Sequence, residues 1–153
     1  MTQKKIYEIL NKHNVWLRYE EGGERADFRE ANLREVKLRG ADLRKADFRR
    51  ANLKGAYLVG TDLKGVYLKG ADIEGANLNG ADLRGAKNYY SFTAYDTSKR
   101  IVHCIEHEDT WMVQAGSFWG TLDELENKVL DTHKSKVYLA NIALLRELLH
   151  IKD

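Results

Sequence analysis

A five-residue unit repeats twelve times in unbroken register across residues 26–85. The third residue of every unit is large and apolar, and the first is Ala in nine units and Val or Thr in three. Because the first and third residues are two apart, both side chains point to the same side of an extended chain. A period of five fits neither an α-helix, at about 3.6 residues per turn, nor an unbroken strand, unless the chain turns once per unit. The repeat therefore predicts a solenoid whose stacked units share one core.

Gly occupies the fifth position of eight units, which suits a corner because Gly tolerates backbone angles that other residues avoid. The units, among them ADFRE, ANLKG and ADLRG, resemble the pentapeptide-repeat family, whose unit is Ala-Asp/Asn-Leu followed by any two residues. The resemblance implies a mainly β fold, a right-handed quadrilateral parallel β-helix with four units per coil. Residues 26–85 would then form about three coils, a stack roughly 15 Å tall with a filled core.

The segments on either side of the repeat predict two further parts. Residues 3–17 place Ile6, Ile9, Leu10 and Leu17 along one helical face, and Gly22-Gly23 ends that helix before the first unit. Since a short solenoid needs its ends covered, we expect this helix to cap one end. The predicted parts are residues 1–25 for the capping helix and the segment after it, 26–87 for the β-helix, and 88–153 for a C-terminal domain.

The C-terminal domain is expected to be a small α+β unit. Residues 88–96, 100–107 and 110–119 are rich in aromatic and β-branched residues and predict three antiparallel strands, the third with a candidate interruption at Gly116. Thr121 and Glu124 form a capping-box pattern that predicts a helix to about His133. A second helix is expected from about Ser135.

The C-terminal segment also resembles a domain of phage proteins, on GSF at 116–118, GTLDEL at 120–125, and Val129 with Thr132-His133. Ser117 stands where that pattern often has Cys. The resemblance implies a phage-encoded protein that acts in the cytoplasm of a bacterial host.

Composition narrows the function classes. The formal net charge is only +2, and the single Cys104 excludes an internal disulfide or a site with several cysteines. No run of eighteen apolar residues is present, and MTQKKIYEIL lacks the apolar core and cleavage site of a signal peptide. We expect a cytoplasmic protein that does not enter the membrane.

Basic residues at the fourth position of the units are the first candidate site. Stacking units twenty residues apart brings six of them to two adjoining faces: Arg29, Arg49, Lys69, Arg44, Lys64 and Arg84. This basic edge would suit an anionic partner. Asp residues at the second positions would neutralise much of its field, so a self-compensated surface is the alternative.

Aromatic residues near the start of the predicted C-terminal helix are the second candidate site. Trp119, Tyr138 and His133 could stack on a ring while Thr121 and the helix N-terminus bind a phosphate, or they could form part of a small core. His103 and His107 lie roughly 13 Å apart on a strand, with Cys104 on its other face, so we assign no metal. No catalytic motif or cofactor fingerprint is present, and we expect neither an enzyme nor a cofactor.

Three functions remain open. The first is sequestration of a small anionic ligand, such as a nucleotide signal used in host defence. The second is binding and blocking of a host protein, and the third is a structural spacer in the virion. Mimicry of DNA towards a topoisomerase is disfavoured because it needs a long acidic rod, and specific nucleic-acid binding is not expected. A homo-oligomer could form through Tyr57, Val59 and Tyr67, or these residues could pack beneath the C-terminal domain.

Overall fold

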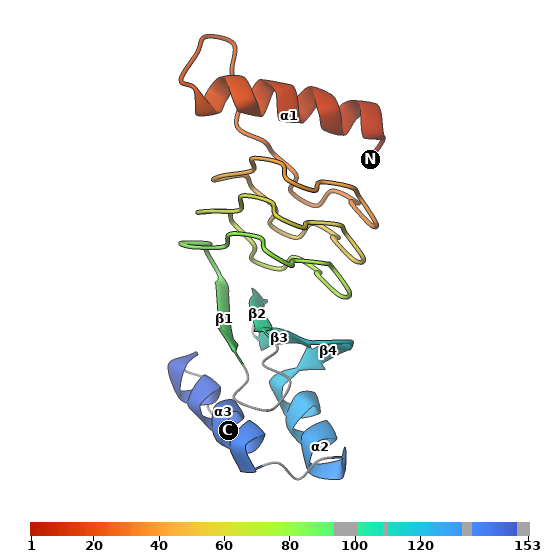
Figure 1. The fold of residues 1–153 in the computed structure, drawn as a ribbon, viewed down its shortest axis with the longest axis vertical. Helices are drawn as coiled ribbons and strands as arrows, with labels where there is room; N and C mark the ends of the chain where they lie inside the picture. The colour runs from red at the N-terminus through yellow and green to blue at the C-terminus, as the bar shows by residue number, and fades with distance from the viewer. Residues whose placement is uncertain (94–100, 109, 133–135, 150–153) are drawn as a thin grey trace. The chain divides into compact units, whose positions relative to one another are not determined.

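A computed structural model of the chain describes residues 1–93, 101–108, 110–132 and 136–149. The chain divides into two compact units, Met1–Tyr89 and Tyr90–Asp153. The first contains helix α1 (Gln3–Leu17) and the repeat segment, and the second contains most of a small sheet and two helices (Figure 1). None of the helices in the described ranges is long and apolar enough to cross a membrane.

Helix α1 begins where Thr2 accepts a hydrogen bond from the Lys5 N–H at 3.3 Å. Its buried residues are Ile6 and His13. The chain then turns back against the helix at Gly23, where a Cβ would lie 2.3 Å from the backbone nitrogen of Trp16. Only Gly fits that contact, so this residue sets the path from the helix into the first repeat unit.

The repeat units stack on parallel ladders in which paired residues lie twenty positions apart. Asp27 pairs with Asp47 and Asp42 with Asp62, and seven further bridges repeat this spacing. The backbone bonds are regular: the Leu33 N–H donates to the carbonyl of Asn52 at 2.8 Å. Each unit therefore stacks on the fourth unit after it in the chain. Figure 1 shows the resulting layers of the repeat segment.

The interior of the stack is filled with side chains. Third-position residues are buried from Phe28 to Ile73, and Phe28 stacks on Phe48 with ring centroids 5.1 Å apart. Thr61, one of the three first-position residues that are not Ala, is buried and donates its hydroxyl to the Leu38 carbonyl at 3.0 Å. The packed core expected from the repeat is confirmed.

The corners have one backbone conformation, whatever residue occupies them. Gly40 has a φ of 68°, and the fifth residues that are not Gly have the same left-handed geometry. Those residues are Glu30, Glu35, Lys45 and Arg50, with φ between 54° and 61°. Side chains other than Gly rarely adopt this conformation, so the stacked core imposes it on them.

The second unit is built on a four-stranded sheet in the order β1-β2-β3-β4, where β1 is Tyr89–Thr93 and β2 is Ile101–His107. Strand β2 pairs antiparallel with β3 (Thr110–Ala115), and β3 pairs antiparallel with β4 (Phe118–Thr121). The prediction of a single strand over 110–119 is therefore wrong in its strand count. Gly116, with a φ of 64°, turns the chain between β3 and β4.

Helices α2 (Leu122–Thr132) and α3 (Lys136–Leu148) pack with the sheet around one core. The core residues are Val102, Cys104, Val113, Leu122, Leu125, Val129, Ile142 and Leu145. Three expectations lie outside the described residues: strand over 94–96, an end of the first helix at His133, and a start of the second at Ser135.

Candidate binding surfaces

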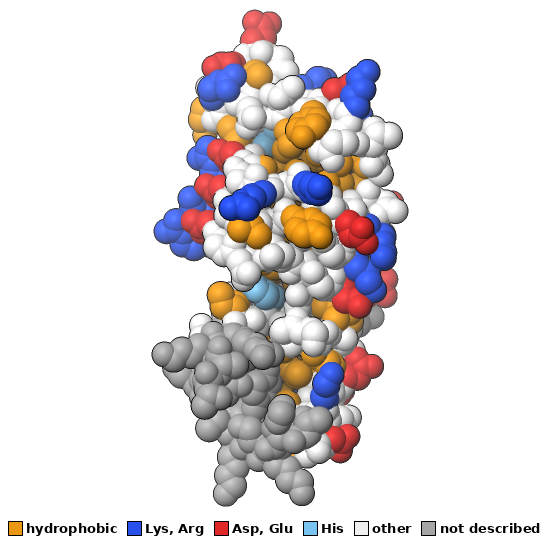
Figure 2. All heavy atoms as spheres, turned by 45° about the vertical axis from the view of Figure 1, so that its right-hand side comes forward, with side chains coloured by type: hydrophobic (Ala, Val, Ile, Leu, Met, Phe, Trp, Pro, Cys, Tyr) orange, Lys and Arg blue, Asp and Glu red, His pale blue; other side chains and the backbone are white. Residues whose placement is uncertain are grey.

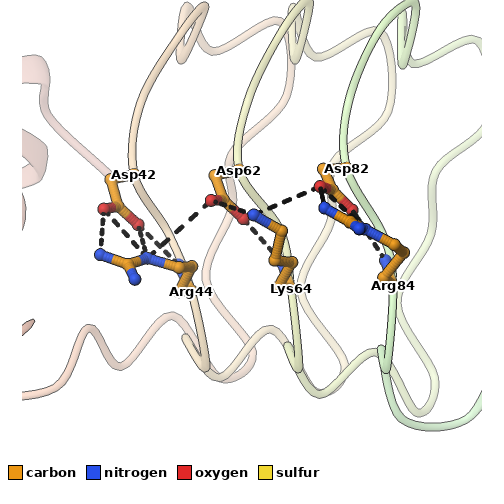
Figure 3. A network of polar contacts seen from close by, with 6 residues as sticks. All are labelled: Asp42, Arg44, Asp62, Lys64, Asp82 and Arg84. Carbon is orange, nitrogen blue, oxygen red and sulfur yellow. Dashed lines mark hydrogen bonds and ion pairs between the residues drawn. The ribbon is translucent and has the colours of Figure 1, made fainter.

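The fourth positions that were predicted to form part of a basic edge lie in a ladder of alternating charge (Figure 3). Arg44 Nη2 lies 2.7 Å from Asp42 Oδ2, and Arg44 Nε lies 3.9 Å from Asp62 Oδ2 in the next layer. Lys64 Nζ lies 3.0 Å from Asp62 and 3.3 Å from Asp82. Each base of the ladder thus contacts a carboxylate of its own unit, and Arg44 and Lys64 also reach the next layer. The ladder comprises Asp42, Asp62, Asp82, Arg44, Lys64 and Arg84.

The pairing follows from the unit itself. Asp at the second position and Arg at the fourth both point outward and lie two residues apart, so their side chains meet. In the last unit Arg84 donates to Asp82 through Nη2 at 2.6 Å and through its backbone N–H at 3.2 Å. These bonds hold the pKa of the Asp82 carboxyl well below its ordinary value. An Asp-x-Arg unit therefore neutralises itself.

The neighbouring face, which carries Arg29, Arg49 and Lys69, contains a buried carboxylate. Asp47 is only 1% exposed and accepts three hydrogen bonds from the Arg49 side chain, the shortest of 2.6 Å, while Arg25 Nη2 lies 3.6 Å from Asp47 Oδ2. Burial alone would raise the pKa of Asp47, but the hydrogen bonds from Arg49 lower it below its usual range.

Arg29 on this face binds its own Asp27 at 2.6 Å, and that bond lowers the pKa of Asp27 to about 2. Lys69 is exposed and also interacts with another residue. Five of the six predicted basic residues, all but Lys69, are thus held by an Asp two positions earlier in the chain.

Two faces of the β-helix do not follow this pattern. On one of them Asn32 and Asn52 occupy second positions, and Lys54 pairs with Glu74 of the next layer. The other carries Tyr57 and Val59, which sequence reasoning named as a candidate dimer interface without the bases beside them. Its units are residues 36–40, 56–60 and 76–80, which contain no Asp or Glu. Lys occupies the second position of the first of these units, so Arg39 has no Asp in its own unit. Among the described residues, no carboxylate forms an ion pair with Lys37 or Arg39. Exposed Tyr57 pairs with Lys37 on the ladder, and half-buried Val59 lies two residues on.

We call Lys37, Arg39, Tyr57 and Val59 the third-face patch. In the view of Figure 2, basic and hydrophobic side chains lie next to one another on the β-helix, and acidic side chains lie toward its margins. The sequence signal for the patch is a second-position Lys, which occurs in one of the twelve units.

The predicted aromatic site lies in the second unit. Trp119 is half-buried on β4 and pairs with Gln114. The capping box is confirmed: the Thr121 N–H donates to Glu124 Oε2 at 2.7 Å, and the Glu124 N–H donates to Thr121 Oγ1 at 3.2 Å. Two N–H groups at the start of α2 are therefore already satisfied. His133 lies outside the described residues, and Tyr138 lies within α3.

Cys104 and His103 point to opposite faces of β2. Cys104 belongs to the core beneath the helices, and burial raises the pKa of its thiol to about 12. Burial lowers the pKa of His103 to about 4. At neutral pH the first is a thiol and the second an uncharged imidazole. No group of three His, Cys, Asp or Glu residues that could hold a metal ion exists in the part of the chain that the structure describes.

The family model described as pentapeptide repeats matches residues 26–65 and 46–85, with eight copies. The repeat segment, residues 26–85, is therefore similar to pentapeptide repeats, and proteins of that family form right-handed β-helices. The match covers the repeats and not the flanking segments. A search of the curated proteins finds no match.

Three solved structures are similar to part of the chain. A pentapeptide repeat protein from the cyanobacterium Cyanothece 51142 is 40% identical over 41% of this chain and 43% of its own, with a TM-score of 0.40. One from the thylakoid lumen of Arabidopsis thaliana is 32% identical over 40% of this chain and 46% of its own, with a TM-score of 0.31.

The third structure is HetL, from the cyanobacterium Nostoc sp. strain PCC 7120, a pentapeptide repeat protein involved in heterocyst differentiation regulation. It is 38% identical over 41% of this chain and 32% of its own, with a TM-score of 0.29. The chain thus spans less than half the length of each of these three proteins.

Proposed function

We propose that the chain is a non-enzymatic binding protein that holds a protein partner on the outer surface of its β-helix. Members of the pentapeptide-repeat family are generally structural or binding proteins and not enzymes. The observation that carries the proposal is that the third-face patch places two bases without a described carboxylate partner beside exposed Tyr57, whereas five of the six bases of the predicted basic edge are held by an Asp of their own unit. A rigid, filled stack of this kind presents side chains at fixed positions without enclosing a ligand.

The competing hypothesis is sequestration of a small anionic ligand, such as a nucleotide, by the basic edge and the aromatic residues. The ion pairs weigh against it, because a phosphate at Arg44 or Arg84 would have to displace a carboxylate bound with two hydrogen bonds to the same guanidinium. The two occupied N–H groups at the start of α2 weigh against a phosphate there.

The proposal also covers the origin of the protein and the compartment in which it acts. The resemblance of the C-terminal segment to phage proteins favours a phage-encoded protein acting in the bacterial cytoplasm, where the partner would be a host protein whose action is blocked. The alternating charges of the ladders, in a stack of about three coils roughly 15 Å tall, do not make the long acidic rod that DNA mimicry needs. A virion spacer would instead sediment with purified particles.

Isothermal titration calorimetry separates the two binding hypotheses. The wild-type chain is titrated with nucleoside mono-, di- and triphosphates and cyclic dinucleotides, beside the variant Arg44→Ala, Lys64→Ala, Arg84→Ala. We expect no saturable heat for any of them. Saturable binding by the wild type that the triple variant loses would refute the proposal and establish a small-anion site on this face.

A positive test uses a photoreactive Phe analogue in place of Val59, on the third face, and in place of Lys64, on the fourth. After irradiation in a bacterial extract, we expect one discrete protein adduct from position 59 and none from position 64. The adduct should disappear when Lys37→Glu and Arg39→Glu are added. Equal labelling from both positions would contradict a partner held on one face.

A further inference from the structure

The third-face patch has the composition of a docking site, and its charge indicates what it would bind. We infer that it docks an extended, acidic segment of a partner protein, with carboxylates on alternate residues. This inference rests on the proposed function and names the chemistry of the partner.

The β-helix itself shows how such a segment would be held. In Asp-x-Arg units a carboxylate sits on each guanidinium, as Asp42 does on Arg44 at 2.7 Å. The unit at residues 36–40 keeps the Arg but has Lys37 in place of the Asp. Two bases therefore lie where an Asp-x-Arg unit places one base and one acid, so this unit offers two positive charges that no described carboxylate neutralises.

The spacing of the bases suits an extended chain. Lys37 and Arg39 lie on either side of buried Leu38, and Arg39 stands in the turn that the Ala41 N–H closes on the Leu38 carbonyl at 3.1 Å. Alternate residues of an extended partner are separated by roughly 7 Å and point to the same side, a span that the long side chains of Lys37 and Arg39 can match. A Glu-x-Glu or Asp-x-Asp segment can therefore place one carboxylate on each base.

Tyr57 and Val59 provide an apolar surface beside the bases. The ladder bridge from Lys37 to Tyr57 places the ring in the next layer, about 4.8 Å along the stack. Tyr57 is 49% exposed although it carries a large apolar ring. Tyr and Arg are the side chains that most often dominate the binding energy of protein interfaces, whereas a solvated charged surface does not need an aromatic residue.

The same observations favour a protein over a nucleic acid. Binding to a phosphate backbone depends on many neutralised phosphates, and the patch offers two bases. Single-stranded nucleic acids are held by several aromatic residues that stack successive bases, and the patch offers one ring. The net charge of +2 also gives little general attraction for a polyanion.

Fluorescence anisotropy tests the inference with a labelled peptide of alternating Glu and Ser, and with a Lys-Ser peptide and a single-stranded RNA of similar length. The variant Lys37→Gln, Arg39→Gln is compared with Lys45→Gln, Arg50→Gln, which removes the same two residue types and the same charge from corner positions. We expect Lys37→Gln, Arg39→Gln to bind the Glu-Ser peptide roughly tenfold more weakly than wild type, and the control pair to change binding by less than about twofold. Tyr57→Ala should weaken binding while leaving its salt dependence unchanged.

Three results would overturn the inference. One is equal weakening by the two pairs of substitutions, which would indicate general electrostatics. Another is no binding of the Glu-Ser peptide by the wild type at low salt. The third is tighter binding of the RNA that depends on Lys37 and Arg39, which would make the partner a nucleic acid. The proposed function fails separately, through saturable nucleotide binding in the calorimetric titration.

Discussion

Buried His13 of the capping helix forms a hydrogen bond with the first repeat unit, and the effect of removing this bond can be predicted and measured. His13 is fully buried, and its Nδ1 accepts the backbone N–H of Ala26 at 3.0 Å. Its ring stacks on Trp16 with centroids 5.5 Å apart. Because Nδ1 accepts, the proton of the uncharged ring is on Nε2.

Replacing His13 by Phe keeps the stacked ring and removes the acceptor. The Ala26 N–H is then buried without a partner, which costs about 1–3 kcal/mol. The same cost should lower the free energy of the local opening that exposes the Ala26 amide. The protection of this amide against hydrogen exchange should then fall by roughly 5- to 150-fold.

The same contact predicts a dependence on pH. Burial lowers the pKa of His13 below its usual 6.5, although the nearby Asp42 carboxylate and a hydrogen bond with the Arg44 backbone act in the opposite direction. The unfolded chain therefore binds this proton more readily than the folded chain. The contribution of His13 to stability is complete above pH 6.5 and is lost as the pH falls below it, because a protonated Nδ1 cannot accept from Ala26.

Amide hydrogen exchange followed by NMR measures both effects, with rates normalised to the intrinsic exchange rate at each pH. The amide of Leu58, which donates to the Asn77 carbonyl at 2.9 Å in the stack, serves as an internal control. We expect Ala26 protection to fall between pH 7 and pH 5 in the wild type and to be low and nearly independent of pH in His13→Phe. Equal Ala26 protection in the two proteins at pH 7 would refute this role of His13.

Four other substitutions test the fold. Asp47→Asn should lower the free energy of unfolding of the β-helical unit by about 1–2 kcal/mol in urea denaturation, a moderate loss because Arg49 is partly exposed. Leu58→Ala should lower it by about 2–5 kcal/mol, since Leu58 is 1% exposed in the filled stack. In the second unit, Thr121→Ala should lower the free energy of unfolding by about 1 kcal/mol because it removes the cap of α2, and Glu124→Gln should lower it by less. Thermal denaturation measures both changes.

The substitutions at Asp47 and Leu58 have matched controls. Asp27→Asn alters an exposed Asp-x-Arg pair and should change stability by less than about 1 kcal/mol. Tyr57→Ala, next to Leu58 but on the surface, should change it by no more than about 0.5 kcal/mol. Losses of equal size at Asp47 and Asp27, or at Leu58 and Tyr57, would contradict the burial pattern on which the predictions depend.

Local sequence rules predicted most of the fold. The register of the five-residue unit identified the third-position core, because every unit repeats one environment. The Thr121 and Glu124 pattern predicted the start of α2, because a capping box acts within four residues. The turn between β3 and β4 was only a candidate interruption at Gly116, since a single Gly does not show whether a strand bends or reverses.

The binding surface was harder to predict. The positions of Arg44 and Arg84 followed from the repeat, and a self-compensated surface was predicted as the alternative to a basic edge. Only the side-chain geometry within the Asp-x-Arg units decides between the two, because a charge count does not show which groups are in contact. His13 lies on the predicted apolar face of α1, one turn from Leu10 and from Leu17, yet a polar residue gives no apolar signal there. Lys37 could have been found as the one base at a second position, had the second and fourth positions been considered together.

The central claim is that the third-face patch, and not the charged ladders, is where the β-helix meets its partner. NMR titration of the isotope-labelled chain with the alternating Glu-Ser peptide tests it most directly, because amide shifts report each face separately. The account predicts saturable shifts grouped at residues 37–39 and 57–59, with residues 42–44, 62–64 and 82–84 unchanged. Shifts centred on the ladder of Arg44, Lys64 and Arg84 would contradict it.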